Sequence, residues 1–99
     1  STNSESFREV VLVEYPRKGI WVIGFVTGET KGEVQTLNKE KLINVFIPTT
    51  PNPTSGFLLF LPKKDLVYMA MKVEDAVKMV ISGGIVTPKN NRSLIKKNN

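Results

Sequence analysis

The fold of this chain depends on residues 46–62, FIPTTPNPTSGFLLFLP, where two apolar runs flank a polar, proline-rich loop. The runs, residues 45–47 and 57–61, are short, uncharged and rich in aromatic and branched side chains. This composition predicts two strands that are buried on both faces, although periodicity alone does not distinguish such a run from a short buried helix.

The loop between the two runs contains three prolines, Pro48, Pro51 and Pro53. Each proline fixes its own φ and holds the preceding residue in an extended conformation, which predicts a stiff loop. A stiff polar loop on a packed scaffold is a candidate binding site. Its candidate residues are Thr49, Thr50, Asn52, Thr54, Ser55 and Gly56. We favour a second interpretation, in which the hydroxyls and the amide satisfy the backbone of an ordered connection.

Residues 10–15 and 20–27 predict two strands joined by a turn at residues 16–19, where a proline and a glycine suit a β-hairpin. Glu14 interrupts the first strand, and we place it at an edge or strand end rather than as a buried functional acid. Arg17 and Lys18 in the turn are secondary binding candidates.

Two features of the second strand carry further expectations. Gly24 predicts a bulge or the close passage of another backbone. Trp21 and Phe25 lie four residues apart on one face of the strand, and we expect both to pack in the core.

The following residues are polar from 28 to 41, and we expect a mobile segment pinned by Val34 and Leu37. Residues 42–47 predict the third strand and residues 57–61 the fourth. Residues 66–71 predict a fifth strand that forms a second hairpin with the fourth.

The apolar period then changes to that of a helix over residues 73–82, with Val73, Ala76, Val77, Val80 and Ile81 on one stripe. Gly83 and Gly84 end this helix with a left-handed cap. Residues 85–86 are candidates for a short last strand. We therefore predict an α+β domain, mostly antiparallel, with five or six strands in a curled sheet or small partly open barrel and one C-terminal helix.

We expect the chain to divide into a flexible leader (1–6), one globular domain (7–86) and a disordered basic tail (87–99). The net charge is +5, and the tail carries four of the positive charges and no acid. The folded part is therefore nearly neutral, and we expect no specific nucleic-acid partner. No apolar run approaches the ~20 residues of a membrane-spanning helix.

The chain has neither cysteine nor histidine, which removes thiolate chemistry, the commonest general base and the commonest metal ligand. We therefore predict no metal site, no cofactor and no catalytic residue. The alternative is a small hydrolase that uses Ser55 or a loop threonine as nucleophile. Its base would be Lys63, Lys64 or Glu14, although no Gly-x-Ser-x-Gly elbow is present.

Three stretches of the chain carry a family resemblance: residues 10–29 (VVLVEYPRKGIWVIGFVTGE), 45–65 (VFIPTTPNPTSGFLLFLPKKD) and 73–86 (VEDAVKMVISGGIV). They closely resemble the continuous-vascular-ring-like family of bacterial and plant membrane proteins. The chain departs from the family pattern at Ala70, often an aspartate, and at Lys72, often a serine or threonine. Lys72 has no side-chain oxygen with which to cap the helix.

The resemblance implies two transmembrane helices upstream of Ser1, so that this chain is the soluble domain of a membrane protein, which we expect on the cytoplasmic side. It implies no established enzymatic activity or cofactor. We therefore expect a non-catalytic binding or assembly module whose partner is itself or another protein, engaged through the edges of the sheet. The alternative is anionic-lipid or nucleic-acid binding through Lys89, Arg92, Lys96 and Lys97, and we prefer to see these as a solubilising tail.

Overall fold

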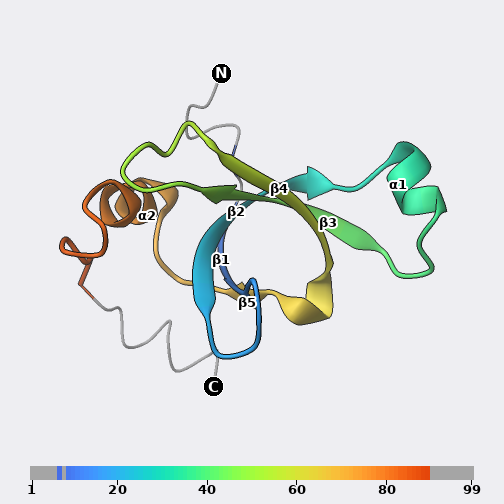
Figure 1. Cartoon of the computed structure of the whole chain (residues 1–99), viewed down its shortest axis with the longest axis horizontal. Coiled ribbons are helices and arrows are strands. Elements are labelled where there is room, and N and C mark those ends of the chain that lie inside the picture. Colours follow the sequence, from blue (N-terminus) through green and yellow to red (C-terminus); the bar gives the residue numbers. More distant parts are fainter. Residues whose placement is uncertain (1–6, 8, 90–99) are drawn as a thin grey trace.

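Five antiparallel strands form one curled sheet, and a helix packs against one side of it (Figure 1). The computed structural model describes residues 7 and 9–89. The strands are β1 (Glu9–Glu14), β2 (Trp21–Glu29), β3 (Leu42–Pro48), β4 (Gly56–Pro62) and β5 (Val67–Tyr68). The helices are α1 (Gly32–Thr36), the 3-10 helix η2 (Lys63–Asp65) and α2 (Val73–Ile81). The predicted α+β class, mostly antiparallel with a C-terminal helix, is confirmed.

The strands β1 to β4 lie side by side in chain order, whereas the connection from β4 leads to the other edge of the sheet. The strand order is β4-β3-β2-β1-β5, so β5 lies at the opposite edge from β4. The predicted hairpin between the fourth and fifth strands is therefore wrong. Instead Val11 of β1 pairs with Tyr68, and Leu12 pairs with Val67. The fifth strand is also only two residues long, against the six that the apolar run predicts.

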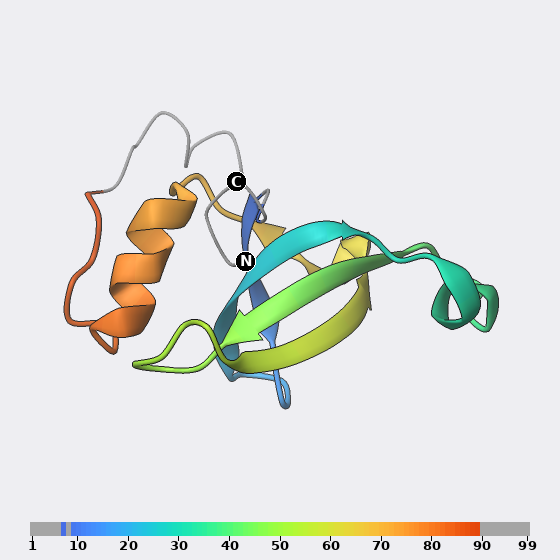
Figure 2. The ribbon, with the colours of Figure 1, turned by 90° about the horizontal axis from the view of Figure 1, so that it is seen from above.

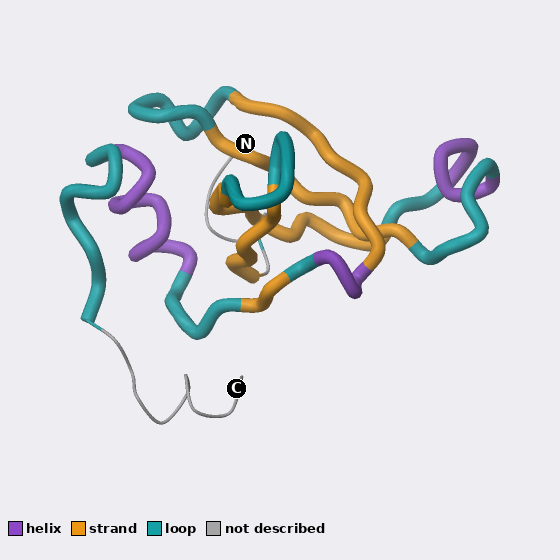
Figure 3. Tube along the Cα trace, turned by 60° about the horizontal axis from the view of Figure 1, so that its bottom comes forward, coloured by secondary structure: helices purple, strands orange, loops and turns teal. Residues whose placement is uncertain are grey.

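The short link between β4 and β5 requires the sheet to curl. Strands lie about 4.8 Å apart, so a flat sheet of this order would separate β4 from β5 by about 19 Å. The link from Pro62 to Val67 includes η2, and with about 2 Å of rise per 3-10 residue it reaches only about 13 Å. The sheet bends to bring its edges toward each other, as Figures 2 and 3 show, without β4 pairing with β5.

The inner face of the curled sheet holds the larger apolar core. Its buried residues are Val11, Val13, Val26, Val45, Ile47 and Leu66. Leu59 and Leu61 of β4 pack against the same cluster as Tyr68 of β5, so side chains from both edges meet inside the curl. We call the side of the sheet with this cluster the inner face and the side that carries α2 the outer face.

Gly24 provides the room that the inner core needs. A Cβ on Gly24 would lie 2.6 Å from Cγ1 of Val45 and 2.9 Å from Cδ1 of Ile47. The close approach at this glycine is therefore made by side chains of the neighbouring strand β3, and not by another backbone as predicted. The bulge lies further along β2, where the pairing with β3 shifts between Val26 and Gly28.

The outer face is covered by α2 over β1 and β2. The buried residues there are Val10, Phe25 and Ala76, and the ring of Phe7 stacks on Phe25 with centroids 4.8 Å apart. Val73 and Val77 pack beside them. The predicted core position of Phe25 is confirmed. Trp21 is 49% exposed, and its predicted core position is wrong because α2 does not reach that end of β2.

The ends of α2 follow from the sequence. Lys72 makes no side-chain capping bond at the start, as expected. At the other end Gly83 and Gly84 have φ values of 68° and 89°. The N–H of Gly84 donates to Met79 O at 2.8 Å and that of Gly83 to Val80 O at 3.2 Å, which is the Schellman arrangement. Ile81, expected on the buried stripe, is 49% exposed.

The polar segment after β2 contains the short helix α1, which the sequence does not predict. Val34 and Leu37 do not pin it to the core as expected, since Leu37 is 77% exposed. Polar groups hold it instead. The hydroxyl of buried Thr30 donates to Asn44 Oδ1 at 2.6 Å, and Gln35 Oε1 accepts the N–H of Leu42 at 2.9 Å.

Two further expectations concern the C-terminal part of the chain. Residues 85–86 form no strand, and Ile85 is 87% exposed, so the predicted sixth strand is wrong. The predicted leader (1–6) and most of the predicted basic tail, including Arg92, Lys96 and Lys97, lie outside the described residues.

Replacing Val77 with Asp tests the packing of α2. The substitution places a carboxylate against Phe25 and Val10, and burying an unpaired charge in an apolar contact is strongly destabilising. We expect a loss of about 2 kcal/mol or more, equivalent to a melting temperature lower by about 10 °C or more. The exposed Lys78→Gln is the control. Equal melting temperatures for Val77→Asp and the parent would contradict this placement of α2.

Candidate functional site

The strand β4 exposes large apolar side chains on both faces. Phe57 is 53% exposed, Leu58 58% and Phe60 38%. The prediction that this strand is buried on both faces is therefore wrong. The reason is its place in the sheet: among the described residues β4 pairs with β3 alone, and α2 covers β1 and β2 at the other side of the outer face. Figure 2 shows β4 as the outermost strand of the curl.

The main chain of β4 points alternately toward β3 and toward the open edge. The N–H of Thr49 donates to Ser55 O at 2.8 Å, and the pairing continues with Ile47 opposite Phe57. Hydrogen-bonded pairs recur at every second residue of an antiparallel ladder, so the N–H and C=O groups of Leu58 and Phe60 point away from β3. We call these four main-chain groups the edge groups.

The seven residues of β4 contain no charge. Exposed edge strands of natural proteins are usually protected against further pairing by charges, bulges or prolines within the strand. Between Phe57 and Leu61 β4 has none of these, and its ladder with β3 is regular from Leu42 to Pro48. The open side of the strand therefore lacks these protections between Phe57 and Leu61.

The candidate loop is braced by its own polar groups. The Thr49 hydroxyl lies 2.6 Å from the carbonyl oxygen of Asn52 and 3.1 Å from that of Ser55. The N–H and the hydroxyl of Thr54 donate to Asn52 Oδ1 at 3.1 and 2.6 Å. The Asn52 amide lies 3.4 Å from Ser55 Oγ. These hydrogen bonds are the ones expected if the polar groups of the loop satisfy its own backbone. A binding role for the loop stays a prediction.

Two contacts hold the loop against the rest of the fold. A Cβ on Gly56 would lie 1.9 Å from the main-chain oxygen of Ile47, so only glycine fits at the junction between the loop and β4. The methyl group of Thr50 lies beside Gly83, so the loop meets the C-terminal cap of α2. Figures 1 and 2 show the loop beside that end of the helix. The loop therefore has a fixed position at the start of β4.

In the alternative catalytic site, the Ser55 hydroxyl and the two candidate lysine bases lie apart. Ser55 precedes β4, whereas Lys63 and Lys64 follow it. The seven residues of β4, at about 3.3 Å each, separate the hydroxyl from these lysines by roughly 20 Å. Neither lysine is therefore in reach as a base for Ser55. Glu14 is exposed at the end of β1, as predicted, and its carboxylate accepts the N–H of Gly19 at 2.9 Å.

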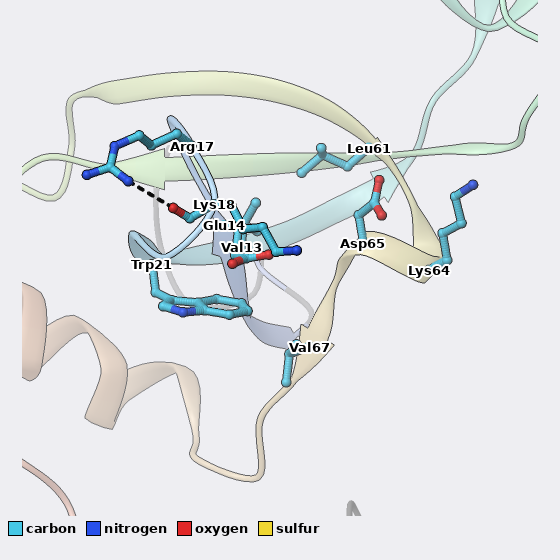
Figure 4. Close-up of a pocket in the computed structure, with 9 residues that line it drawn as sticks. All are labelled: Val13, Glu14, Arg17, Lys18, Trp21, Leu61, Lys64, Asp65 and Val67. Carbon is cyan, nitrogen blue, oxygen red and sulfur yellow. Dashed lines mark hydrogen bonds between the residues drawn. The ribbon is translucent and has the colours of Figure 1, made fainter.

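The secondary candidates, Arg17 and Lys18, lie in the predicted turn between β1 and β2, at a pocket of about 540 Å³ (Figure 4). The pocket is lined by Val13, Glu14, Arg17, Lys18, Trp21, Leu61, Lys64, Asp65 and Val67. Arg17 donates to the carbonyl of Lys18 at 3.1 Å, and Figure 4 shows its guanidinium and the ammonium of Lys64 extending away from each other. The pocket therefore brings charged residues together without directing the cations of Arg17 and Lys64 at one point.

Two residues near this pocket have shifted pKa values. The ammonium of Lys64 lies 2.8 Å from the carboxylate of Glu40, and this hydrogen bond, with the attraction between the two charges, raises the pKa of Lys64. Both side chains are exposed, so the pair adds little to stability. Burial, followed by the negative charge of Glu9, raises the pKa of the Tyr68 phenol above its ordinary value near 10. Within the described part of the chain, no three acidic side chains gather where they could hold a metal ion.

The chain is similar in sequence to known proteins. A family described as "Protein of unknown function (DUF502)" matches residues 1–55. Among curated proteins, Protein LIKE COV 1 and Protein CONTINUOUS VASCULAR RING 1 of Arabidopsis thaliana are each 28% identical to this chain over 86 residues. Both matches cover 87% of the chain, and they cover 33% and 31% of the two relatives. No solved structure matches.

Replacing Gly56 with Ala tests the junction between the loop and β4. The new methyl group must displace the Ile47 carbonyl, and such overpacking costs about 1–3 kcal/mol. We expect the melting temperature to fall by at least about 5 °C. Ser55→Ala is the matched control, since it removes only the 3.4 Å contact with Asn52, and it should leave the melting temperature within a degree or two. A Gly56→Ala protein as stable as the control would contradict the close approach to Ile47.

Replacing Tyr68 with Phe tests the raised pKa of Tyr68. A folded-state pKa above the unfolded value means that the unfolded chain loses this proton first, so the stability is complete below the unfolded pKa and is lost as the pH rises through the folded one. We expect the parent to lose more stability than Tyr68→Phe between about pH 9 and pH 11. Denaturant unfolding at both pH values measures this difference. Equal losses of stability in the two proteins over this pH range would contradict the raised pKa of Tyr68.

Proposed function

The chain belongs to the family described as "Protein of unknown function (DUF502)", and on this premise we propose that its folded part is a non-catalytic contact module of a membrane-anchored protein. The module binds another polypeptide along β4. The edge groups supply main-chain hydrogen bonds, and the exposed side chains of the strand supply apolar area, which together form the recognition mode of strand addition.

The observation that carries this proposal is the exposure of Phe57, Leu58 and Phe60 on a strand with an open side. Single exposed apolar residues are ordinary on protein surfaces, whereas several of them along the two faces of an open edge strand favour contact with another chain. Here three such residues lie within four positions of one uncharged strand. The unpaired edge groups beside these side chains form a template for pairing with another backbone.

The loop before β4 contributes a fixed boundary to the surface. Its internal hydrogen bonds and its contact with the cap of α2 hold Thr50 and Asn52 at the beginning of the strand. An ordered boundary lowers the entropy cost of binding, because less of the surface has to be immobilised. The candidate residues of the loop therefore serve as the rim of the contact and β4 as its centre.

The membrane context comes from the family resemblance and from length. The chain spans about a third of the length of the curated relatives that it matches. None of the helices among residues 7 and 9–89 is long and apolar enough to cross a membrane. We place the anchor in segments upstream of this chain and the module on the cytoplasmic side. An anchor of this kind would concentrate the module at a surface and so strengthen weak contacts.

Site-specific photo-crosslinking tests the contact surface. A benzophenone side chain is placed at Phe60 in the whole gene product in its native host, and the matched control carries it at the exposed Thr36 on α1. We expect covalent polypeptide adducts several times more abundant from position 60 than from position 36. Absent adducts at position 60, or equal yields at both positions, would contradict the proposal.

A further inference from the structure

We infer that the polypeptide which pairs with β4 is the β4 strand of a second copy of this chain, in an antiparallel arrangement centred on Leu59. This inference rests on the proposed contact function and names its partner. Three properties of the strand carry it: the positions of the edge groups, the order of its side chains and the positions of the flanking charges.

The edge groups fit a two-fold arrangement. When Leu59 lies opposite its own copy, Leu58 of each chain lies opposite Phe60 of the other. Both residues direct their N–H and C=O groups outward, as the ladder with β3 requires. Each of the two Leu58–Phe60 pairs can therefore exchange both main-chain hydrogen bonds. A contact that uses the same patch on both copies closes at two and does not propagate into a fibre.

The side chains of β4 are complementary to themselves in this register. On the outer face each Leu58 meets a Phe60, and on the inner face each Phe57 meets a Leu61 while the two Leu59 side chains face each other. Every pair between residues 57 and 61 thus joins two apolar side chains. Aromatic and branched aliphatic pairs across strands are among the stabilising combinations. A second β4 is therefore a partner that matches at all of these positions.

The flanking charges favour the antiparallel direction. Lys63 and Lys64 follow β4, and no charged residue lies between Pro48 and Pro62. In the antiparallel pair, Lys63 of one copy lies opposite Ser55 of the other and Lys64 lies opposite Thr54. The lysine pairs of the two copies are then roughly 25 Å apart, beyond the screening length of about 8 Å at physiological salt. Parallel pairing would place all four lysines together.

The exposed area predicts a reversible dimer. Taking about 200 Å² for a large apolar side chain, Phe57, Leu58 and Phe60 leave about 300 Å² exposed on each copy. Two copies then bury less than the about 1,200 Å² of a stable interface, and such pairs are typically weak. We expect the isolated chain to dimerise with a dissociation constant between about 10 µM and 1 mM. A common membrane anchor would raise the local concentration into this range.

Sedimentation over this concentration range, with a charge exchange at the strand, tests the inference. The parent should pass from 11.1 kDa to twice that mass. Leu58→Lys/Phe60→Lys and Leu58→Glu/Phe60→Glu should each bind themselves at least tenfold more weakly, because like charges face each other. An equimolar mixture of the two variants should recover the dimer, since lysine then faces glutamate. Leu37→Lys, at the exposed position that follows α1, is the control and should dimerise like the parent.

Unchanged dimerisation of the lysine variant, or no recovery in the mixture, would overturn the inference. So would a parent that stays at 11.1 kDa throughout. If such a monomeric chain still crosslinks to other polypeptides from Phe60, the contact function stands and the second copy as partner fails. A parent that dimerises only after removal of residues 1–6 or 90–99 would place one of those segments at the edge and also overturn it. Circular dichroism of each variant confirms that the fold is retained.

Discussion

The structure depends on how little of the sheet its covering helix reaches. The helix α2 has nine residues and packs on two of the five strands. The helix therefore covers the outer face of only part of the sheet, and it lies over β1 and β2. On the inner face the curl lets side chains of both edges share one core. The outer face of β4 is left uncovered at Leu58 and Phe60.

The local elements of this fold were predictable from the sequence because their signals lie within the elements. The turn at residues 16–19, the stripe of α2 and the left-handed glycines at its end each depend on neighbours a few positions away. The α+β class follows from these elements. The short helix α1 was missed because it has no apolar stripe and is held by polar contacts of Thr30 and Gln35.

The long-range arrangement was not predictable, for a physical reason. The fourth and fifth apolar runs are adjacent in sequence, and adjacency suggested a hairpin, but the 3-10 helix η2 carries the chain across the curl to β1. The sequence also overestimates the burial of β4, because burial depends on which strands lie beside it and not on its own residues. A strand with no charge has the same sequence signature in the centre of a sheet as at an edge that meets a partner. The candidate loop was located correctly as an ordered unit, since its prolines and Asx-type hydrogen bonds are local, but the open edge beside it follows only from topology.

The main-chain groups of Leu58 and Phe60 are proposed to be available to another strand. Residue-resolved amide hydrogen exchange of the chain, measured at low and high concentration, reports on these groups individually. We expect the Leu58 and Phe60 amides to exchange rapidly when the chain is dilute and slowly when it is concentrated, while the amide of Leu59, bonded to β3, stays protected throughout. Equal exchange of all three amides, unaffected by concentration, would contradict this proposal.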